Sequence, residues 1–212
     1  AYDAVSNMVS MTDANGHTTS YGYDVLNRPV SVTDPLGYTT SNKYDASGNM
    51  VSQTDANGKI TSYSYDVLNR LTQISYADGQ KVSYGYDAMG NRLTMTDGHG
   101  VTKYEYDSLN RLLSVINPNG KKVGYIYDES GNLIKMTYPD GKTASYSYDD
   151  INRITAVTDR SGHITSYTYD ANNILINMAY PNGMSTDYVY DEDGRLIQMI
   201  NKNGKQVVSS FE

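Results

Sequence analysis

The sequence predicts an all-β fold in which tandem 21-residue β-hairpin repeats form a long, antiparallel and curled β-sheet strip. Three observations predict this fold. The dipeptide Tyr-Asp recurs at a nearly constant spacing through the whole chain of 212 residues. Turn signatures made of Asp, Asn, Pro and Gly recur at and between these dipeptides. The segments between turns alternate apolar and polar side chains, which is the period of a strand and not of a helix.

The Tyr-Asp dipeptide marks ten repeats. The chain has 22 Tyr, one Phe and no Trp, and so skewed a choice of aromatic residue indicates one position copied many times. The spacing is 21 residues except between Tyr86 and Tyr106, where it is 20. We expect a single repeat domain over residues 1–212 that is a fragment of a longer protein. The repeats start near Tyr2, Tyr23, Tyr44, Tyr65, Tyr86, Tyr106, Tyr127, Tyr148, Tyr169 and Tyr190.

Each repeat contains two expected turns. Between the Tyr-Asp copies, a Gly follows an Asp, Asn or Tyr by three residues, which is typical of a type I turn that ends in a left-handed residue. At the Tyr-Asp copies, Gly or Asn follows the Asp by three residues, and both tolerate a left-handed backbone. The residues expected to build the repeat are represented by Tyr23, Asp24, Tyr65, Asp66, Tyr106, Asp107, Tyr148, Asp149, Gly37, Gly79, Gly120 and Gly162.

The segments between turns are predicted to be strands of about six residues. In 80–86, Val82, Tyr84 and Tyr86 share one parity, and in the preceding segment the eighth and tenth positions of the repeat are mostly apolar. These positions predict one face of Tyr and aliphatic side chains. A sheet of so many strands should curl, and an incomplete strip would leave two unpaired edges. A β-solenoid is the rival architecture, but the reversing turns favour hairpins.

Composition excludes several classes of function. Lys and Arg number 17 and Asp and Glu number 24, so the chain carries a net charge of −7 and would repel nucleic acid. The absence of Cys excludes disulfides, thiolate metal sites and Cys nucleophiles. No apolar run is long enough for a transmembrane helix. No signal peptide opens the sequence, so an export signal is expected outside this segment.

The repeated motifs resemble the Rhs/YD-repeat family. The resemblance is carried by Tyr-Asp-x-x-Gly-Asn at 44–49 and 127–132, by Tyr-Asp-x-Leu-Asn-Arg-Leu at 65–71 and 106–112, and by Tyr-Pro-Asp-Gly at 138–141. It covers the whole chain. Members of this family form spiralling β-sheet strips that close into hollow shells. In bacterial polymorphic toxins and toxin complexes the shell encloses a C-terminal toxin, and in teneurins a similar shell belongs to an adhesion ectodomain.

No catalytic, metal-binding or cofactor-binding residue is predicted. The Asp of each Tyr-Asp opens a turn and is interpreted as a cap for backbone N–H groups, not as a calcium ligand. His17, His99 and His163 stand beside turn glycines and are interpreted as exposed turn residues. No Ser or Thr has a committed base. The segment 34–37 matches the Asp-Pro-x-Gly motif after which family toxins are released, but it stands in register with the other turns and is interpreted as one of them.

The Tyr rows leave two interpretations open. Tyr buries a large ring while its hydroxyl reaches a partner or water, which is a structural role. On a concave face the same rings would stack against sugars or an enclosed polypeptide. The candidate ligand-contact aromatics are Tyr63, Tyr84 and Tyr146. Arg28 and its four equivalents are expected to pair with Asp or to stack on Tyr.

We therefore expect a non-enzymatic segment of a secreted or cell-surface protein that forms the wall of a shell around another polypeptide, such as a C-terminal toxin. One alternative is a cell-surface adhesion or carbohydrate-binding module, and a second is an extracellular fibre that polymerises edge to edge. The expected partners are other repeats or domains of the same polypeptide, an enclosed toxin domain or glycans, and no cofactor.

Overall fold

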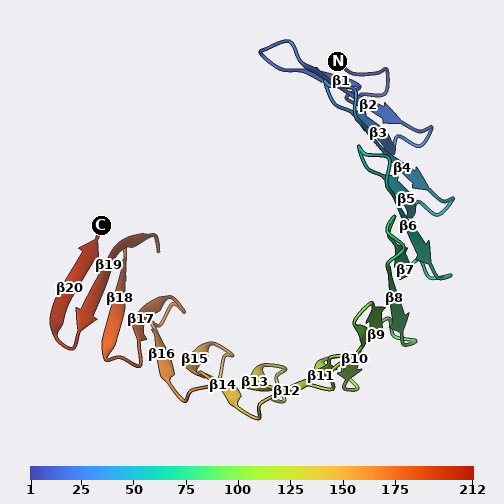
Figure 1. Cartoon of the computed structure of the whole chain (residues 1–212). Coiled ribbons are helices and arrows are strands. Elements are labelled where there is room, and N and C mark those ends of the chain that lie inside the picture. Colours follow the sequence, from blue (N-terminus) through green and yellow to red (C-terminus); the bar gives the residue numbers. More distant parts are fainter. The chain divides into compact units, whose positions relative to one another are not determined.

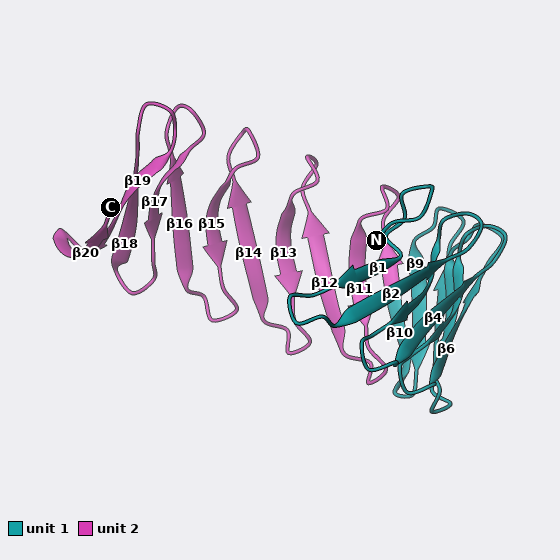
Figure 2. Cartoon of the chain, turned by 90° about the horizontal axis from the view of Figure 1, so that it is seen from above, with its two compact units in different colours: residues 1–103 teal, residues 104–212 magenta.

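The computed structural model describes residues 1–212 and contains 20 strands and no helix. It divides into two compact units, Ala1–Lys103 and Tyr104–Glu212, which Figure 2 shows in separate colours. Since the structure has no helix at all, none is present that could cross a membrane. The strands are assigned to one β-sheet, so the predicted all-β class is confirmed.

The strands are short and follow one another at regular intervals, as Figure 1 shows. The first unit holds β1 (Ser10–Thr12), β2 (Thr18–Tyr23), β3 (Pro29–Thr33), β4 (Thr39–Tyr44), β5 (Met50–Thr54), β6 (Ile60–Tyr65), β7 (Leu71–Ser75), β8 (Lys81–Tyr86) and β9 (Arg92–Asp97). Strand β10 (Gly100–Tyr106) begins in the first unit and ends in the second. The second unit continues with β11 (Leu112–Ile116), β12 (Lys122–Tyr127), β13 (Leu133–Thr137), β14 (Thr143–Tyr148), β15 (Ile154–Thr158), β16 (Ile164–Tyr169), β17 (Leu175–Ala179), β18 (Met184–Tyr190), β19 (Leu196–Asn203) and β20 (Gln206–Phe211).

Consecutive strands pair antiparallel from β1 to β10 and from β11 to β20. In the β6–β7 hairpin, Tyr63 lies opposite Ile74, and in the β7–β8 hairpin the same Ile74 lies opposite Val82. The predicted face of Tyr and aliphatic side chains is therefore formed by cross-strand pairs, which are the unit of sheet stabilisation. This antiparallel pairing confirms the hairpin architecture and contradicts the β-solenoid alternative.

The expected turns form through a pair of backbone hydrogen bonds. At Asp55–Lys59, the N–H of Gly58 donates to the Asp55 carbonyl (2.9 Å), and the N–H of Asp55 donates to the Lys59 carbonyl (2.9 Å). Gly58 has a φ of 77°. At the Tyr-Asp turns, Asn69 takes the equivalent left-handed position with a φ of 60°. Asp or Asn thus opens the turn, and Gly or Asn ends it without a large strain.

Two turns differ from the expectation. Asp97 pairs with Gly100 in the ladder, so only Gly98 and His99 connect β9 to β10. This is the repeat that lacks one residue, and the loss shortens the turn. Near the C-terminus, the expected turn between Asn201 and Gly204 is absent, because the ladder extends to the pair of Asn203 and Gln206.

A β-bulge interrupts the strict alternation that the sequence predicts. Ser64 pairs with Gln73, but the next residue, Tyr65, pairs with Leu71, so that Thr72 is unpaired. The same shift occurs between β2 and β3, β4 and β5, β8 and β9, β12 and β13, β14 and β15, β16 and β17, and β18 and β19. The aliphatic residues opposite the Tyr pair therefore stand at positions 7 and 10 of the repeat, and not at 8 and 10 as expected. A bulge allows this because it inserts one extra residue into one strand.

Each unit consists of a single layer of sheet. Strands contact only the strands that precede and follow them in the chain. The chain has only three buried residues, which are Ala144, Ser114 and Thr186. Of these, Ser114 alone has a fully covered side chain. Most Tyr rings are half-buried between their neighbours. The core of the molecule is therefore a row of cross-strand pairs and not an interior between two layers.

Candidate functional site

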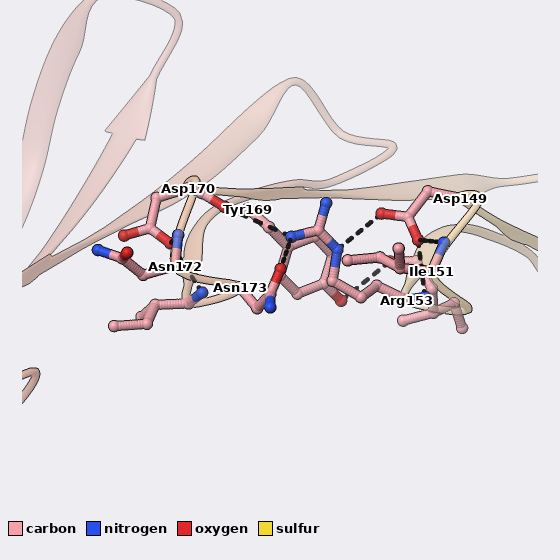
Figure 3. Close-up of polar contacts among 9 residues, drawn as sticks. Asp149, Ile151, Arg153, Tyr169, Asp170, Asn172 and Asn173 are labelled. Carbon is pink, nitrogen blue, oxygen red and sulfur yellow. Dashed lines mark hydrogen bonds and ion pairs between the residues drawn. The ribbon is translucent and has the colours of Figure 1, made fainter.

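The side-chain contacts that recur most regularly lie at the Tyr-Asp turns. In the turn that begins at Asp149, one carboxylate oxygen accepts hydrogen bonds from the N–H groups of Ile151 (3.1 Å) and Arg153 (2.9 Å). The other carboxylate oxygen accepts a bond from Arg153 Nε at 2.7 Å, as Figure 3 shows. Both oxygens are thus engaged, because the type I turn directs these donors at the Asp that opens it.

The same Arg side chain also reaches the next repeat. Arg153 Nη1 donates to the Asp170 carbonyl (3.4 Å) and to Asn173 Oδ1 (2.8 Å), and the guanidinium lies 4.7 Å from the centre of the Tyr169 ring. Figure 3 shows this bridge from one turn to the following one. A planar guanidinium suits such a role because it has several donors and stacks on aromatic faces. We call this arrangement the Arg clamp. It recurs at Arg28, Arg70 and Arg111.

An Asn takes the place of the Arg in the intervening repeats. Asn49 Nδ2 donates to the carboxylate of Asp45 (3.0 Å) and to Oδ1 of Asn69 in the following repeat (2.8 Å). The acceptor Asn69 is the left-handed residue of its own turn. The same link recurs from Asn7 to Asn27 and from Asn132 to Asn152. The Arg clamp and this Asn link alternate, so that two repeats, and not one, form the complete unit of side-chain contacts.

The Tyr of Tyr-Asp makes a third kind of link. The Tyr65 hydroxyl donates to the Met50 carbonyl at 2.9 Å, and the Tyr86 hydroxyl donates to the Leu71 carbonyl at 2.8 Å. In each case the acceptor lies fifteen residues earlier, at the seventh position of the preceding repeat. Five further tyrosines make the same bond, namely Tyr23, Tyr44, Tyr127, Tyr148 and Tyr169. Each hydroxyl thus joins its hairpin to the previous one.

These contacts shift the acidity of the groups involved. The backbone N–H of Arg70 is the largest cause that lowers the pKa of Asp66, with a further contribution from the Arg70 side chain, and partial desolvation opposes both. At Asp45 the side-chain amide of Asn49 is the largest cause of a lowered pKa. Desolvation raises the pKa of the Tyr65 hydroxyl. The carboxylates of Asp66 and Asp45 are therefore held ionised and the Tyr65 phenol is held protonated, which preserves their hydrogen bonds near neutral pH.

The candidate ligand-contact aromatics lie in strand interiors. Tyr63 in β6, Tyr84 in β8 and Tyr146 in β14 lie opposite Ile74, Met95 and Val157, respectively. All three rings are half-buried. The guanidinium of Arg92 lies 5.8 Å from the centre of the Tyr84 ring. Tyr63 and Tyr84 of the first unit are separated by a whole repeat along the sheet, and Tyr146 belongs to the second unit.

The turns at the other edge carry the glycines singled out in the sequence. Gly37, Gly79, Gly120 and Gly162 have φ values of 87°, 86°, 75° and 87°. Two of the His side chains contact the Asp that opens their own turn. His17 Nδ1 lies 3.1 Å from the Asp13 carboxylate, and His163 Nδ1 lies 3.1 Å from that of Asp159.

Polar clusters on the strands were not found by sequence reasoning. Glu105 accepts hydrogen bonds from the Ser114 hydroxyl (2.6 Å) and from Lys122 Nζ (2.9 Å). Asp187 forms an ion pair with Lys202 on the adjacent strand. No signal at the scale of one repeat marks these residues, because each cluster occurs once. They bridge neighbouring strands and satisfy one another, which makes them structural contacts. No group of three or more His, Asp or Glu side chains is arranged to hold a metal ion.

Family comparisons identify the repeat. A family model described as Teneurin YD-shell matches residues 59–209, and a second model described as RHS Repeat matches residues 2–39. The larger match covers well over half of the chain. No curated protein matches the chain at a significant level.

Solved structures of bacterial toxin complexes share the fold. The Tc holotoxin pore of Photorhabdus luminescens is 22% identical, with a TM-score of 0.61 over 97% of this chain and 13% of that chain. A crystal structure of TcdB2-TccC3-TEV is 16% identical, with a TM-score of 0.65 over 99% and 14% of the two chains. A crystal structure of TcdB2-TccC3 is 21% identical, with a TM-score of 0.60 over 98% and 14%. This chain therefore spans about one seventh of the length of those proteins.

Proposed function

The chain belongs to the teneurin YD-shell family, and from this membership we propose that it forms a non-catalytic stretch of the wall of a protein shell that encloses or contacts another polypeptide, such as a toxin domain. The proposal includes residues 1–212 as ten repeats of one longer polypeptide. Its place of action is outside the cell or at the cell surface. Its mechanism is steric containment, for which no reacting group is needed.

The single-layer sheet is the observation that carries this proposal. The chain exposes 13831 Å² of surface, whereas a compact monomer of its mass would expose about 9,800 Å². The difference arises because neither face of the sheet is covered by a second layer of the same unit. The wall of a shell needs this construction. The contacts that stabilise it lie within the layer, so that one face is free to meet the enclosed polypeptide and the other is free to meet solvent.

The Arg clamps and the Tyr hydroxyl bonds suit a wall for a further reason. Both link each hairpin to the next through side chains, in addition to the backbone ladder between their strands. A sheet without a second layer has few other contacts that resist opening between hairpins. We propose that the half-buried rings of Tyr63, Tyr84 and Tyr146 stiffen the same layer and present one edge to the enclosed polypeptide.

The test uses the full-length polypeptide that contains these residues. We expect limited proteolysis, followed by mass spectrometry, to leave a protected region outside the repeats. A variant that lacks residues 44–85 removes two whole repeats and rejoins Lys43 to Tyr86, which occupies the same repeat position as Tyr44. Opening the wall in this way should make the protected region cleavable.

A matched control separates containment from general instability. Leu36→Ser alters an exposed turn residue and should leave the protection unchanged, while circular dichroism should show that both variants keep their β-structure. The proposal fails if every region outside the repeats is digested at the same rate in the intact chain and in the variant that lacks 44–85.

A further inference from the structure

The Tyr-Asp turns of the first unit expose a row of large apolar side chains. Val25 and Val67 are each 97% exposed, Leu26 and Leu68 are each 64% exposed, and Met89 is 74% exposed. All of them occupy the two tip positions of their turns, after Tyr-Asp. We call the ten tip residues of these five turns the first-unit tip row. The row consists of Ala4, Val5, Val25, Leu26, Ala46, Ser47, Val67, Leu68, Ala88 and Met89.

The first-unit tip row carries no charge, although the chain has a net charge of −7. The corresponding turns of the second unit include Glu129, Asp150, Glu192 and Asp193 among their ten tip residues. At the opposite edge of the first unit, Leu36 is the single large aliphatic residue at a turn tip. An uncharged apolar row confined to one edge of one unit is the kind of surface that proteins use for association.

The tips also alternate in size. The second and fourth repeats present Val-Leu, whereas the third presents Ala46 and Ser47. Equivalent tips two repeats apart are separated by four strand spacings, or about 19 Å. When two such rows face each other in opposite directions, with the second repeat of one against the third of the other, the Val-Leu tip of each second repeat meets an Ala-Ser tip. The Val-Leu tip of each fourth repeat then meets the Ala-Val tip of a first repeat. The row is therefore complementary to itself, as a two-fold interface requires.

We propose that the first-unit tip row is a homodimer interface, in which it docks against the same row of a second copy of this chain. The acidic tips of the second unit do not take part, because they would repel each other and bury unpaired charge. The inference is independent of the proposed wall function, since it concerns the turn edge and not a face of the sheet. A row of turn tips is narrower than the surface of about 800 Å² per partner that stable complexes bury, so the association is weak.

The first test measures the mass of the intact 212-residue chain by sedimentation velocity up to about 1 mM, the range in which weak complexes form. We expect a monomer–dimer equilibrium. The double variant Leu26→Glu/Leu68→Glu should raise its Kd by about tenfold or more, and Leu36→Glu at the opposite edge should leave it unchanged. A chain that stays monomeric at every concentration, or a control that weakens the dimer equally, would overturn the proposal.

The second test checks the alignment and uses the absence of natural Cys. Leu26→Cys and Ser47→Cys chains are prepared separately and then mixed under mild oxidation. The proposed alignment places residue 26 of one copy beside residue 47 of the other, so the mixture should form a heterodimeric disulfide faster than either variant forms a homodimeric one. Equal rates in all three samples would contradict the alignment.

Discussion

At the scale of single residues, one hydrogen bond explains why the repeat uses Tyr where Phe would fill the same space. The Tyr65 hydroxyl in β6 donates to the Met50 carbonyl in the adjacent strand β5. The acceptor stands at the seventh position of its repeat, the position that the bulge pairs with the preceding Tyr. A Phe would leave the carbonyl without this donor and would gain nothing in burial. The choice of Tyr at the Tyr-Asp positions thus has a physical cause.

We expect Tyr65→Phe to lower the free energy of unfolding by about 1 kcal/mol, because it removes a hydrogen bond to a half-buried carbonyl. Urea denaturation followed by circular dichroism measures this change. Tyr38→Phe is the matched control, since Tyr38 is 54% exposed at a turn, and it should change stability by less than about 0.5 kcal/mol. Equal effects of the two substitutions would show that the hydroxyl bond contributes nothing.

The capping carboxylates give the chain a predictable dependence on pH. The pKa of Asp66 is lowered in the folded state, first by the backbone N–H of Arg70. The unfolded chain therefore binds more protons between the folded pKa and the ordinary Asp value of about 3.9, and stability falls as the pH falls through this window. We expect urea midpoints to be steady near neutral pH and to decline below about pH 4. Asp66→Asn should reduce the slope with which the urea midpoint declines as the pH falls. An unchanged slope would show that Asp66 does not contribute to the loss of stability at low pH.

At the scale of the hairpin, the left-handed Asn residues have a role that Gly cannot fulfil. Asn69 has a φ of 60°, which Gly adopts at least as easily, yet its side chain also accepts the bond from Asn49 of the preceding repeat. A double-mutant cycle of Asn69→Gly and Asn49→Ala separates the two contributions. We expect a coupling energy of about 0.5–1 kcal/mol from denaturation data, as for a single exposed hydrogen bond. Additive effects would mean that the Asn link does not join the hairpins.

Turns and strand pairs could be predicted from the sequence because each rests on residues close together in the chain. Asp55 and Gly58 specify their turn by spacing alone, and the structure has it. The bulge could not be predicted from alternation, since the position of the unpaired Thr72 depends on how two strands align. The sequence nevertheless contains an indication of the bulge. Leu71 and Ile74 are both apolar although they are three residues apart, and strict alternation would place residues at that spacing on opposite faces. The expectation that Arg70 pairs with Asp or stacks on Tyr is confirmed by its contacts with Asp66 and Tyr86. Its bond to the Asp87 carbonyl was not predicted, because it joins two repeats.

At the scale of the whole molecule, each strand contacts only the strands next to it in the chain. This predicts that a destabilising substitution affects mainly the neighbouring strands. Such an array behaves as a chain of neighbouring units whose stabilities are coupled only through their interfaces. Gly120 offers a clean perturbation, because its φ is 75° and a Cβ added there would meet no atom within 4 Å. Gly120→Val therefore tests backbone strain alone and should cost more than about 2 kcal/mol locally. Asn119→Ala, an exposed change in the same turn, is the control.

We expect hydrogen–deuterium exchange to show where this strain spreads. In Gly120→Val, protection should fall in β11 and β12 and less in the adjoining β13, because these strands share the altered hairpin and its interface. Protection in β4 to β6 should stay as in the unaltered chain, since these strands pair with strands of the first unit. A uniform loss in both units would instead mean that the sheet opens as one cooperative body, and nearest-neighbour contacts would then be insufficient to explain its stability.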